Sequence, residues 1–168
     1  MKLKNLLLIL FAVSLPANSA EFTFNGSVVK STIQASEVKC NGYSILVKED
    51  RFPYEVEDKV PDKVALKGFF GTDLIVGAEA FVKKASAEHK IPVSIEKYQR
   101  KGNLLNDGRV YIPGSGYCLS ESSFLLSVWS GGNCKQCELL IKYQINPDGR
   151  ATEVGLPSRE EFHKVLGR

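Results

Sequence analysis

Short segments of alternating apolar and polar residues, separated by turn residues, dominate this chain. Because successive side chains of a strand point to opposite faces, this period of two is typical of a half-buried strand. Predicted strands cover residues 22–29, 43–47, 64–70, 93–99, 109–112, 124–129, 139–145 and 151–155. Residues 106–108 and 146–149 combine Asn, Asp and Gly as tight hairpin turns do. The pattern predicts a mainly β fold, either an antiparallel sandwich or a partly open barrel.

Two segments between these strands are less regular. Residues 48–63 are rich in charge and contain Pro53 and Pro61, so they are predicted to form a surface connection, with Phe52 tucked onto the core. Residues 73–90 fit both a helical and a strand pattern, but Gly77 would interrupt a helix. We expect a strand through Lys84, followed by a loop that carries His89.

A short α-helix is predicted at the C-terminus. Ser158 follows Pro157 and precedes Glu161 by three residues, which is the spacing of a capping box. The helix should run to about Leu166, with Phe162, Val165 and Leu166 on its apolar stripe.

Residues 1–20 have the layout of an export signal. Lys2 and Lys4 precede an apolar run at 6–13, and small residues follow at Ala17, Ser19 and Ala20. The alternative, a membrane anchor, needs about 20 apolar residues, which is more than this run contains. We expect cleavage after Ala20 and a periplasmic or secreted, soluble protein. Residues 21–168 would then form a single disulfide-braced, β-rich domain without a transmembrane segment.

The charge of the chain excludes a strong general attraction to polyanions. The 22 Lys and Arg residues include Lys2 and Lys4 of the leader, so 20 basic residues would face 19 acidic ones after cleavage. A net charge near +1 does not predict nucleic-acid binding.

Four cysteines, Cys40, Cys118, Cys134 and Cys137, all lie after the leader. An even count in an oxidising compartment indicates disulfides. One arrangement pairs Cys134 with Cys137 locally and Cys40 with Cys118. The competing arrangement pairs Cys118 with Cys134 or Cys137, and Cys40 with the other.

The Cys134–Cys137 spacing also fits two chemical sites. A thioredoxin-like centre would need a helix after the first cysteine, whereas residues 139–145 alternate as a strand. A four-thiolate zinc site usually has two such knuckles, and this chain has one. Structural disulfides are therefore the favoured interpretation.

Catalytic signals are weak. The two histidines, His89 and His163, stand in unrelated segments, and the acidic residues are scattered. We expect no catalytic residues, no cofactor and no metal. The most binding-like surface is a pair of loops at 113–123 and 130–137, with Tyr117, Trp129 and Asn133 as candidate contact residues.

These observations favour an exported binding domain or a component of an envelope or surface assembly, with an unidentified protein or envelope component as its partner. One alternative is a secreted inhibitor of a hydrolase that inserts residues 114–118 as a loop. A second alternative is a periplasmic thiol–disulfide protein that uses Cys134 and Cys137.

Overall fold

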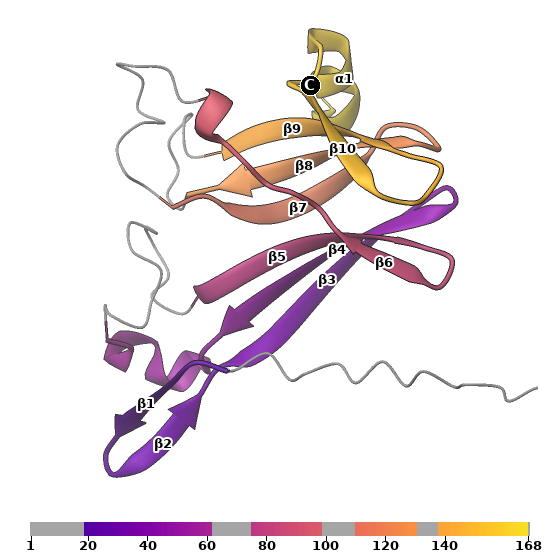
Figure 1. The fold of residues 1–168 in the computed structure, drawn as a ribbon. Coiled ribbons are helices and arrows are strands. Elements are labelled where there is room, and N and C mark those ends of the chain that lie inside the picture. The colour runs from indigo at the N-terminus through magenta and orange to yellow at the C-terminus, as the bar shows by residue number, and fades with distance from the viewer. Residues whose placement is uncertain (1–18, 62–74, 99–109, 131–137, 168) are drawn as a thin grey trace, which may run out of the picture.

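Two four-stranded antiparallel sheets lie face to face in the computed structural model, which describes residues 19–61, 75–98, 110–130 and 138–167 (Figure 1). The first sheet has the order β3–β4–β5–β6, with bounds Thr32–Cys40, Tyr43–Arg51, Ile75–Lys84 and Ala87–Lys90. The second has the order β10–β9–β8–β7, with bounds Ala151–Gly155, Glu138–Ile145, Ser123–Trp129 and Ile112–Cys118. The described strands form no closed barrel, so the structure confirms the predicted mainly β fold in its sandwich form.

The core lies between the two sheets. It is built from alternate residues of the inner strands: Tyr43, Ile45, Val47, Ala80, Val82, Phe124, Leu126, Val128, Ile141, Tyr143 and Ile145. Each fully buried aliphatic or aromatic side chain of this kind stabilises the fold by about 1.5–3 kcal/mol. Phe124 also stacks on Tyr143 of the neighbouring strand, with ring centroids 5.3 Å apart, within the range of about 4.5–7 Å that aromatic pairs favour.

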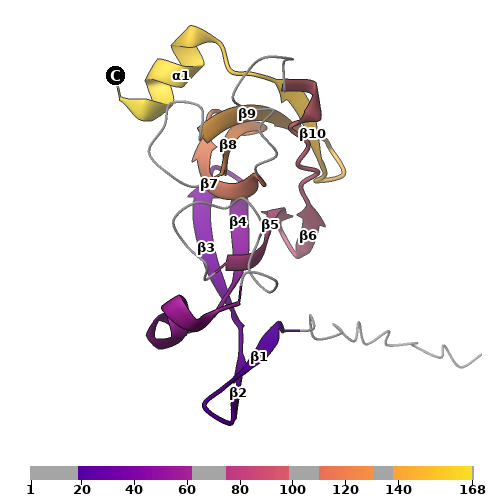
Figure 2. The same ribbon diagram turned by 90° about the vertical axis from the view of Figure 1, so that its left-hand side faces the viewer.

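The prediction of one strand over residues 22–29 is wrong. The segment folds back on itself as the hairpin β1 (Glu21–Phe24) and β2 (Ser27–Lys30). Asn25 and Gly26 have φ values of 49° and 79°. Two consecutive residues with positive φ form the tight turn that suits a two-residue hairpin loop, and Asn-Gly is its preferred sequence. In both views this hairpin lies at the opposite end of the molecule from the C-terminal helix (Figure 2).

The sheet around β4 is larger than the sequence suggested. β4 continues to Arg51 instead of ending at 47, because the long partner strand β3, which the sequence patterns missed, pairs with it over its whole length. The 3₁₀ helix η1 (Tyr54–Lys59) follows it, so only part of 48–63 is a surface connection. Phe52 is buried, as predicted, and it packs edge to face on Phe22.

The segment after β5 also differs from expectation. β5 confirms the predicted strand through Lys84, but His89 lies in β6 and not in a loop. Ala85, with a φ of 54°, reverses the chain tightly enough for β6 to pair with β5. Of the strand predicted over 93–99, the described residues 93–98 form none: the chain runs from one sheet to the other and includes the 3₁₀ helix η2 (Glu96–Tyr98) (Figure 1). Pro92 cannot donate the backbone hydrogen bond that continued pairing requires.

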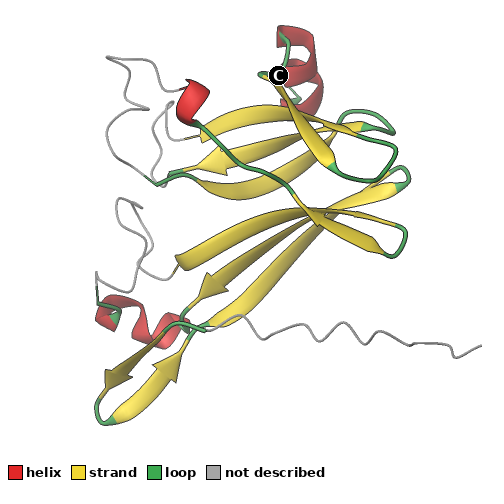
Figure 3. Cartoon of the chain, viewed as in Figure 1, coloured by secondary structure: helices red, strands yellow, loops and turns green. Residues whose placement is uncertain are grey.

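From β8 onward the chain follows its sequence pattern closely. The strand predicted over residues 109–112 is wrong, because residues 110 and 111 lie in no strand and β7 begins at Ile112. β8, β9 and β10 match three predicted strands, and the turn at 146–149 joins β9 to β10. The helix α1 (Arg159–Leu166) is the C-terminal helix of Figure 3. It begins at the predicted capping box, in which Ser158 and Glu161 satisfy each other's backbone N–H groups. The predicted strand at 64–70 and the turn at 106–108 lie outside the described residues.

Within the described ranges, no helix combines the length and apolar character that crossing a lipid bilayer requires.

Candidate functional site

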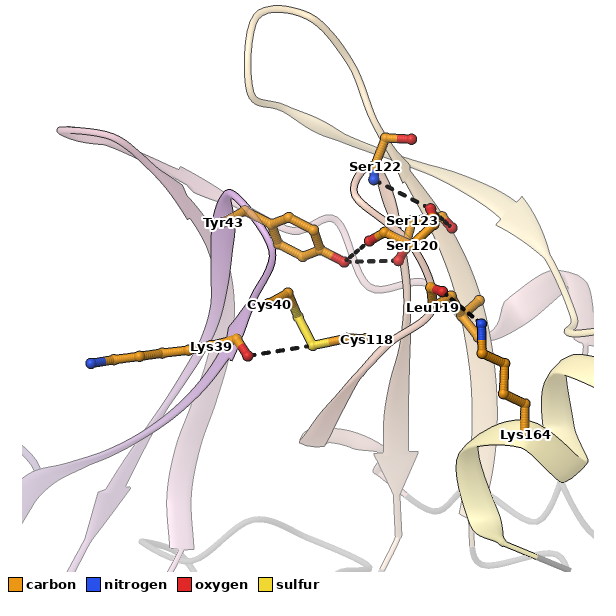
Figure 4. Close-up of a disulfide and its surroundings, with 9 residues drawn as sticks. All are labelled: Lys39, Cys40, Tyr43, Cys118, Leu119, Ser120, Ser122, Ser123 and Lys164. Carbon is orange, nitrogen blue, oxygen red and sulfur yellow. Dashed lines mark hydrogen bonds between the residues drawn. A yellow bond between two sulfur atoms is a disulfide. The ribbon is translucent and has the colours of Figure 1, made fainter.

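A disulfide joins the two sheets at one end of the sandwich. Cys40 is the last residue of β3 and Cys118 the last of β7, and their Cα atoms are 5.6 Å apart. This bond belongs to the first of the two predicted arrangements, and it excludes the pairing of Cys118 with Cys134 or Cys137. Those two cysteines lie outside the described residues. Figure 4 shows this disulfide and its surroundings.

Tyr43 reaches from the first sheet into the turn of the second. Its hydroxyl lies 2.8 Å from the carbonyl oxygen of Ser123 and 3.1 Å from that of Ser120, so it donates to a pair of backbone acceptors (Figure 4). Burial raises the pKa of Tyr43 to about 12, which keeps the hydroxyl protonated as a donor. The tyrosine therefore links the sheets a few residues from the disulfide.

The turn between β7 and β8, residues 119–122, is held on several sides. The backbone N–H groups of Leu119 and Ser120 both donate to Ser123 O, and the Ser120 and Ser123 hydroxyls lie 2.7 Å apart. Lys164 of α1 donates to Leu119 O at 3.1 Å. We use the name braced end for three features together: this turn, the β3–β4 turn at 41–42 and the Cys40–Cys118 bond.

At the exposed edge of the braced end, the side-chain amide of Asn41 donates a hydrogen bond to Glu121 Oε1 at 2.8 Å. The Cys118 sulfur lies 3.6 Å from Lys39 O; because a disulfide sulfur carries no proton, this is a contact and not a hydrogen bond. The braced end is thus a rigid platform assembled from both sheets and α1.

The predicted binding loop at 113–123 is mostly strand. Residues 112–118 form β7, so only the short turn at 119–122 remains a loop. A bulge between Pro113 and Gly116 explains why the sequence, rich in Gly and Ser, does not look like a strand. Ser115 N–H donates to Ser127 Oγ of β8, which secures the bulge.

Residues 114–118, which the inhibitor hypothesis treats as an inserting loop, lie in strand β7. Gly116 packs closely on the other sheet, since a Cβ atom at this position would lie 2.7 Å from Ile45. Ser115 and Cys118 are exposed, and Tyr117 is half-buried. The segment is therefore an edge strand and not the predicted loop.

Two of the three candidate contact residues, Tyr117 and Trp129, lie in the described part of the chain, on different strands of the second sheet. Tyr117 is half-buried in β7, and burial, followed by the nearby Glu138 carboxylate, raises its pKa. Trp129 ends β8 and packs on the small cluster of Ile75 and Ile112, so it contributes to packing. Asn133 lies outside the described residues.

The strand register places Tyr117 on the sheet face that α1 covers. Tyr117 lies opposite Leu125, and Leu125 lies opposite Lys142. Lys142 in turn forms an ion pair with Glu161 of α1. This ion pair and the Ser158 N–H hold the pKa of Glu161 below its usual range.

An apolar groove runs between α1 and β9 on that same face. Its volume is about 380 Å³, and its lining is Glu138, Leu139, Leu140, Leu156, Pro157, Phe162 and Leu166. Phe162 is 40% exposed and Leu156 54% exposed. The sequence predicts Phe162, Val165 and Leu166 as the apolar stripe of this helix. Because α1 has no buried residue, that stripe is only partly covered.

The described residues offer no evident catalytic or metal centre. No group of three or more His, Cys, Asp or Glu side chains in these ranges is placed to hold a metal ion. His163 lies beside Arg159 on α1, whereas His89 is in β6 of the other sheet. No family model, no curated protein and no solved structure matches the chain, so the site is interpreted from its own geometry.

Proposed function

We propose that this protein is an exported binding domain that acts in an envelope or surface assembly. The observation that carries the proposal is the Cys40–Cys118 disulfide. Disulfides persist in the periplasm and outside the cell and are rare in the reducing cytosol. The bond agrees with the leader-like pattern of residues 1–20 and joins the two sheets at the braced end.

The groove between α1 and β9 is the surface that we propose for the partner. Leu156 and Phe162 would lose their exposure to water when apolar side chains of a partner protein enter it. Its walls are positioned by the capping box at Ser158 and by the contact of Lys164 with the braced end. A groove on a rigid scaffold loses little conformational freedom on binding, which favours affinity.

Co-purification from the native host under mild conditions tests this function. The wild-type chain should retain envelope proteins that Phe162→Glu loses, because a charge in the groove would oppose burial. Val28→Glu is the matched control: Val28 is 59% exposed but lies on the hairpin at the far end of the molecule. A clean monomer from the wild type, or equal loss in both variants, would contradict the proposal.

A further inference from the structure

Ala20 is an integral part of the fold although it lies at the edge of the leader. The backbone N–H of Ser31 donates to Ala20 O at 2.8 Å, and the Ser31 hydroxyl lies 3.2 Å from the same oxygen. Ser31 is only 4% exposed, so water does not easily replace this acceptor. The Ala20 side chain also packs against the small cluster around Phe52 and Val60.

One oxygen of the Asp50 carboxylate lacks a hydrogen-bond partner among the described residues. This atom, Oδ1, is buried. Asp50 lines a cavity of about 260 Å³ together with Ser19, Ser31, Ile33, Lys48, Gly77, Ala78 and Glu79. Lys48 is paired with Glu88, and Glu79 with Lys90, so the other charges of the cavity have partners of their own.

The leader sequence allows a cut on either side of Ala20. A cut after Ser19 places the small residues Ala17 and Ser19 at the third and first positions before the bond. A cut after Ala20 places the larger Asn18 at the third position. Export signals usually end in a small residue at both positions, which favours the bond between Ser19 and Ala20.

We propose that the leader is removed between Ser19 and Ala20, and not after Ala20 as the sequence analysis expects, and that the new amino group of Ala20 becomes the cationic partner of Asp50. This inference rests on the proposed export. A signal peptidase would add one water molecule across the peptide bond: Ser19 leaves with a carboxylate, and Ala20 keeps a protonated amino group. That group borders the cavity, because it occupies the position at which Ser19, one of the lining residues, was attached.

A cut one residue later would damage the fold. It would remove Ala20 O and leave the buried N–H and hydroxyl of Ser31 without their acceptor. A buried donor that loses its partner is expected to lower the folding equilibrium constant about tenfold or more. The earlier cut keeps both hydrogen bonds and provides Asp50 with a positive charge.

N-terminal sequencing and intact mass of the chain exported by a bacterial host test the cleavage site directly. The expected mature protein begins Ala-Glu-Phe. A protein that begins at Glu21 or at any other residue overturns the inference but leaves export intact. An uncleaved chain in the cytosol overturns both the inference and the proposed function.

Chemical unfolding of two chains, made to begin at Ala20 and at Glu21, tests the physical reason. The chain that begins at Ala20 should have a folding equilibrium constant about tenfold higher. Ser31→Ala should remove only the part of that advantage that the hydroxyl provides, because its backbone N–H still donates to Ala20 O. Equal stability of the two chains would contradict the role given to Ala20.

The pairing with Asp50 has its own measurement, an NMR titration of the Ala20 amino group. A neighbouring carboxylate favours the charged amine, so its pKa should lie above the ordinary range of about 7.7–8.0. Asp50→Asn should return it to that range. Glu79→Gln is the matched control, because Glu79 lines the same cavity but is paired with Lys90. In this variant the pKa of the Ala20 amino group should stay raised. No change in Asp50→Asn would overturn the pairing.

Discussion

Gly116 shows how one residue sets the spacing between the two sheets. A Cβ atom there would lie 2.7 Å from two atoms of Ile45 and 2.8 Å from a third. Gly116→Ala should therefore lower the free energy of unfolding by about 1–3 kcal/mol, as overpacking of a core does. Gly77→Ala is the control, since nothing lies within 4 Å of its added carbon. Urea unfolding that shows equal, small effects in both variants would contradict the close approach of β7 to β4.

Tyr43 links the sheets through a single hydroxyl, so its ionisation should weaken the fold at high pH. The unfolded chain loses the phenol proton near pH 10, whereas the folded protein keeps it until about pH 12. Between these values the folded state binds more protons, and the free energy of unfolding falls as pH rises.

Tyr43→Phe tests this link. It should lower stability at pH 7 by about 1 kcal/mol, the usual net value of a hydrogen bond, and should make the loss between pH 10 and 12 less steep. Burial also raises the pKa of Tyr143, so part of the alkaline loss should remain. Urea midpoints measured across pH provide the comparison; identical alkaline slopes for the variant and the wild type would contradict the role of Tyr43.

At the scale of the element, α1 depends on its capping box. Ser158→Ala should destabilise the helix by about 1 kcal/mol, because the Glu161 N–H loses its acceptor. Glu161→Gln keeps a side-chain acceptor for Ser158 N–H but removes the charge that pairs with Lys142. Hydrogen exchange of the first-turn amides should rise more in Ser158→Ala than in Glu161→Gln; the reverse order would show that the ion pair, and not the cap, holds α1.

The elements that the sequence predicted well are those in which every local signal agrees. β8 to α1 combine clear alternation, a strong turn at 146–149 and a complete capping box. β3 was missed because its side chains are mostly exposed, so its apolar pattern is weak and pairing with β4 decides its structure. The alternation at 93–99 was misleading because period two does not show whether a partner strand is within reach.

The candidate site was also hard to predict, because it depends on contacts between segments that are distant in the sequence. Tyr117 and Trp129 were chosen for their Gly- and Ser-rich neighbourhood, but Gly116 serves close packing and not a loop. The exposure of Phe162 and Leu156 depends on where α1 packs against the sheet. The spacing of residues along the chain does not predict that position. The sequence allows Cys40 and Cys118 as one possible pair. Only the fold shows that the two cysteines lie next to each other across the two sheets.

For the whole molecule, the disulfide closes a loop of 78 residues between the two sheets. In the chain-entropy account, such a crosslink contributes roughly 4–5 kcal/mol by restricting the unfolded chain. The double variant Cys40→Ser/Cys118→Ser should therefore lose about 2–5 kcal/mol of unfolding free energy. Its far-UV circular dichroism should stay native, because the core between the sheets remains. A stability equal to that of the wild type would show that the bond is not a brace.

The most direct test of the account is a peptide mass map of the exported protein under non-reducing conditions. We predict a peptide pair linked through Cys40 and Cys118 in a chain that has lost its leader. A fully reduced protein with its leader intact, or Cys118 joined to Cys134 or Cys137, would contradict an exported domain braced across its two sheets.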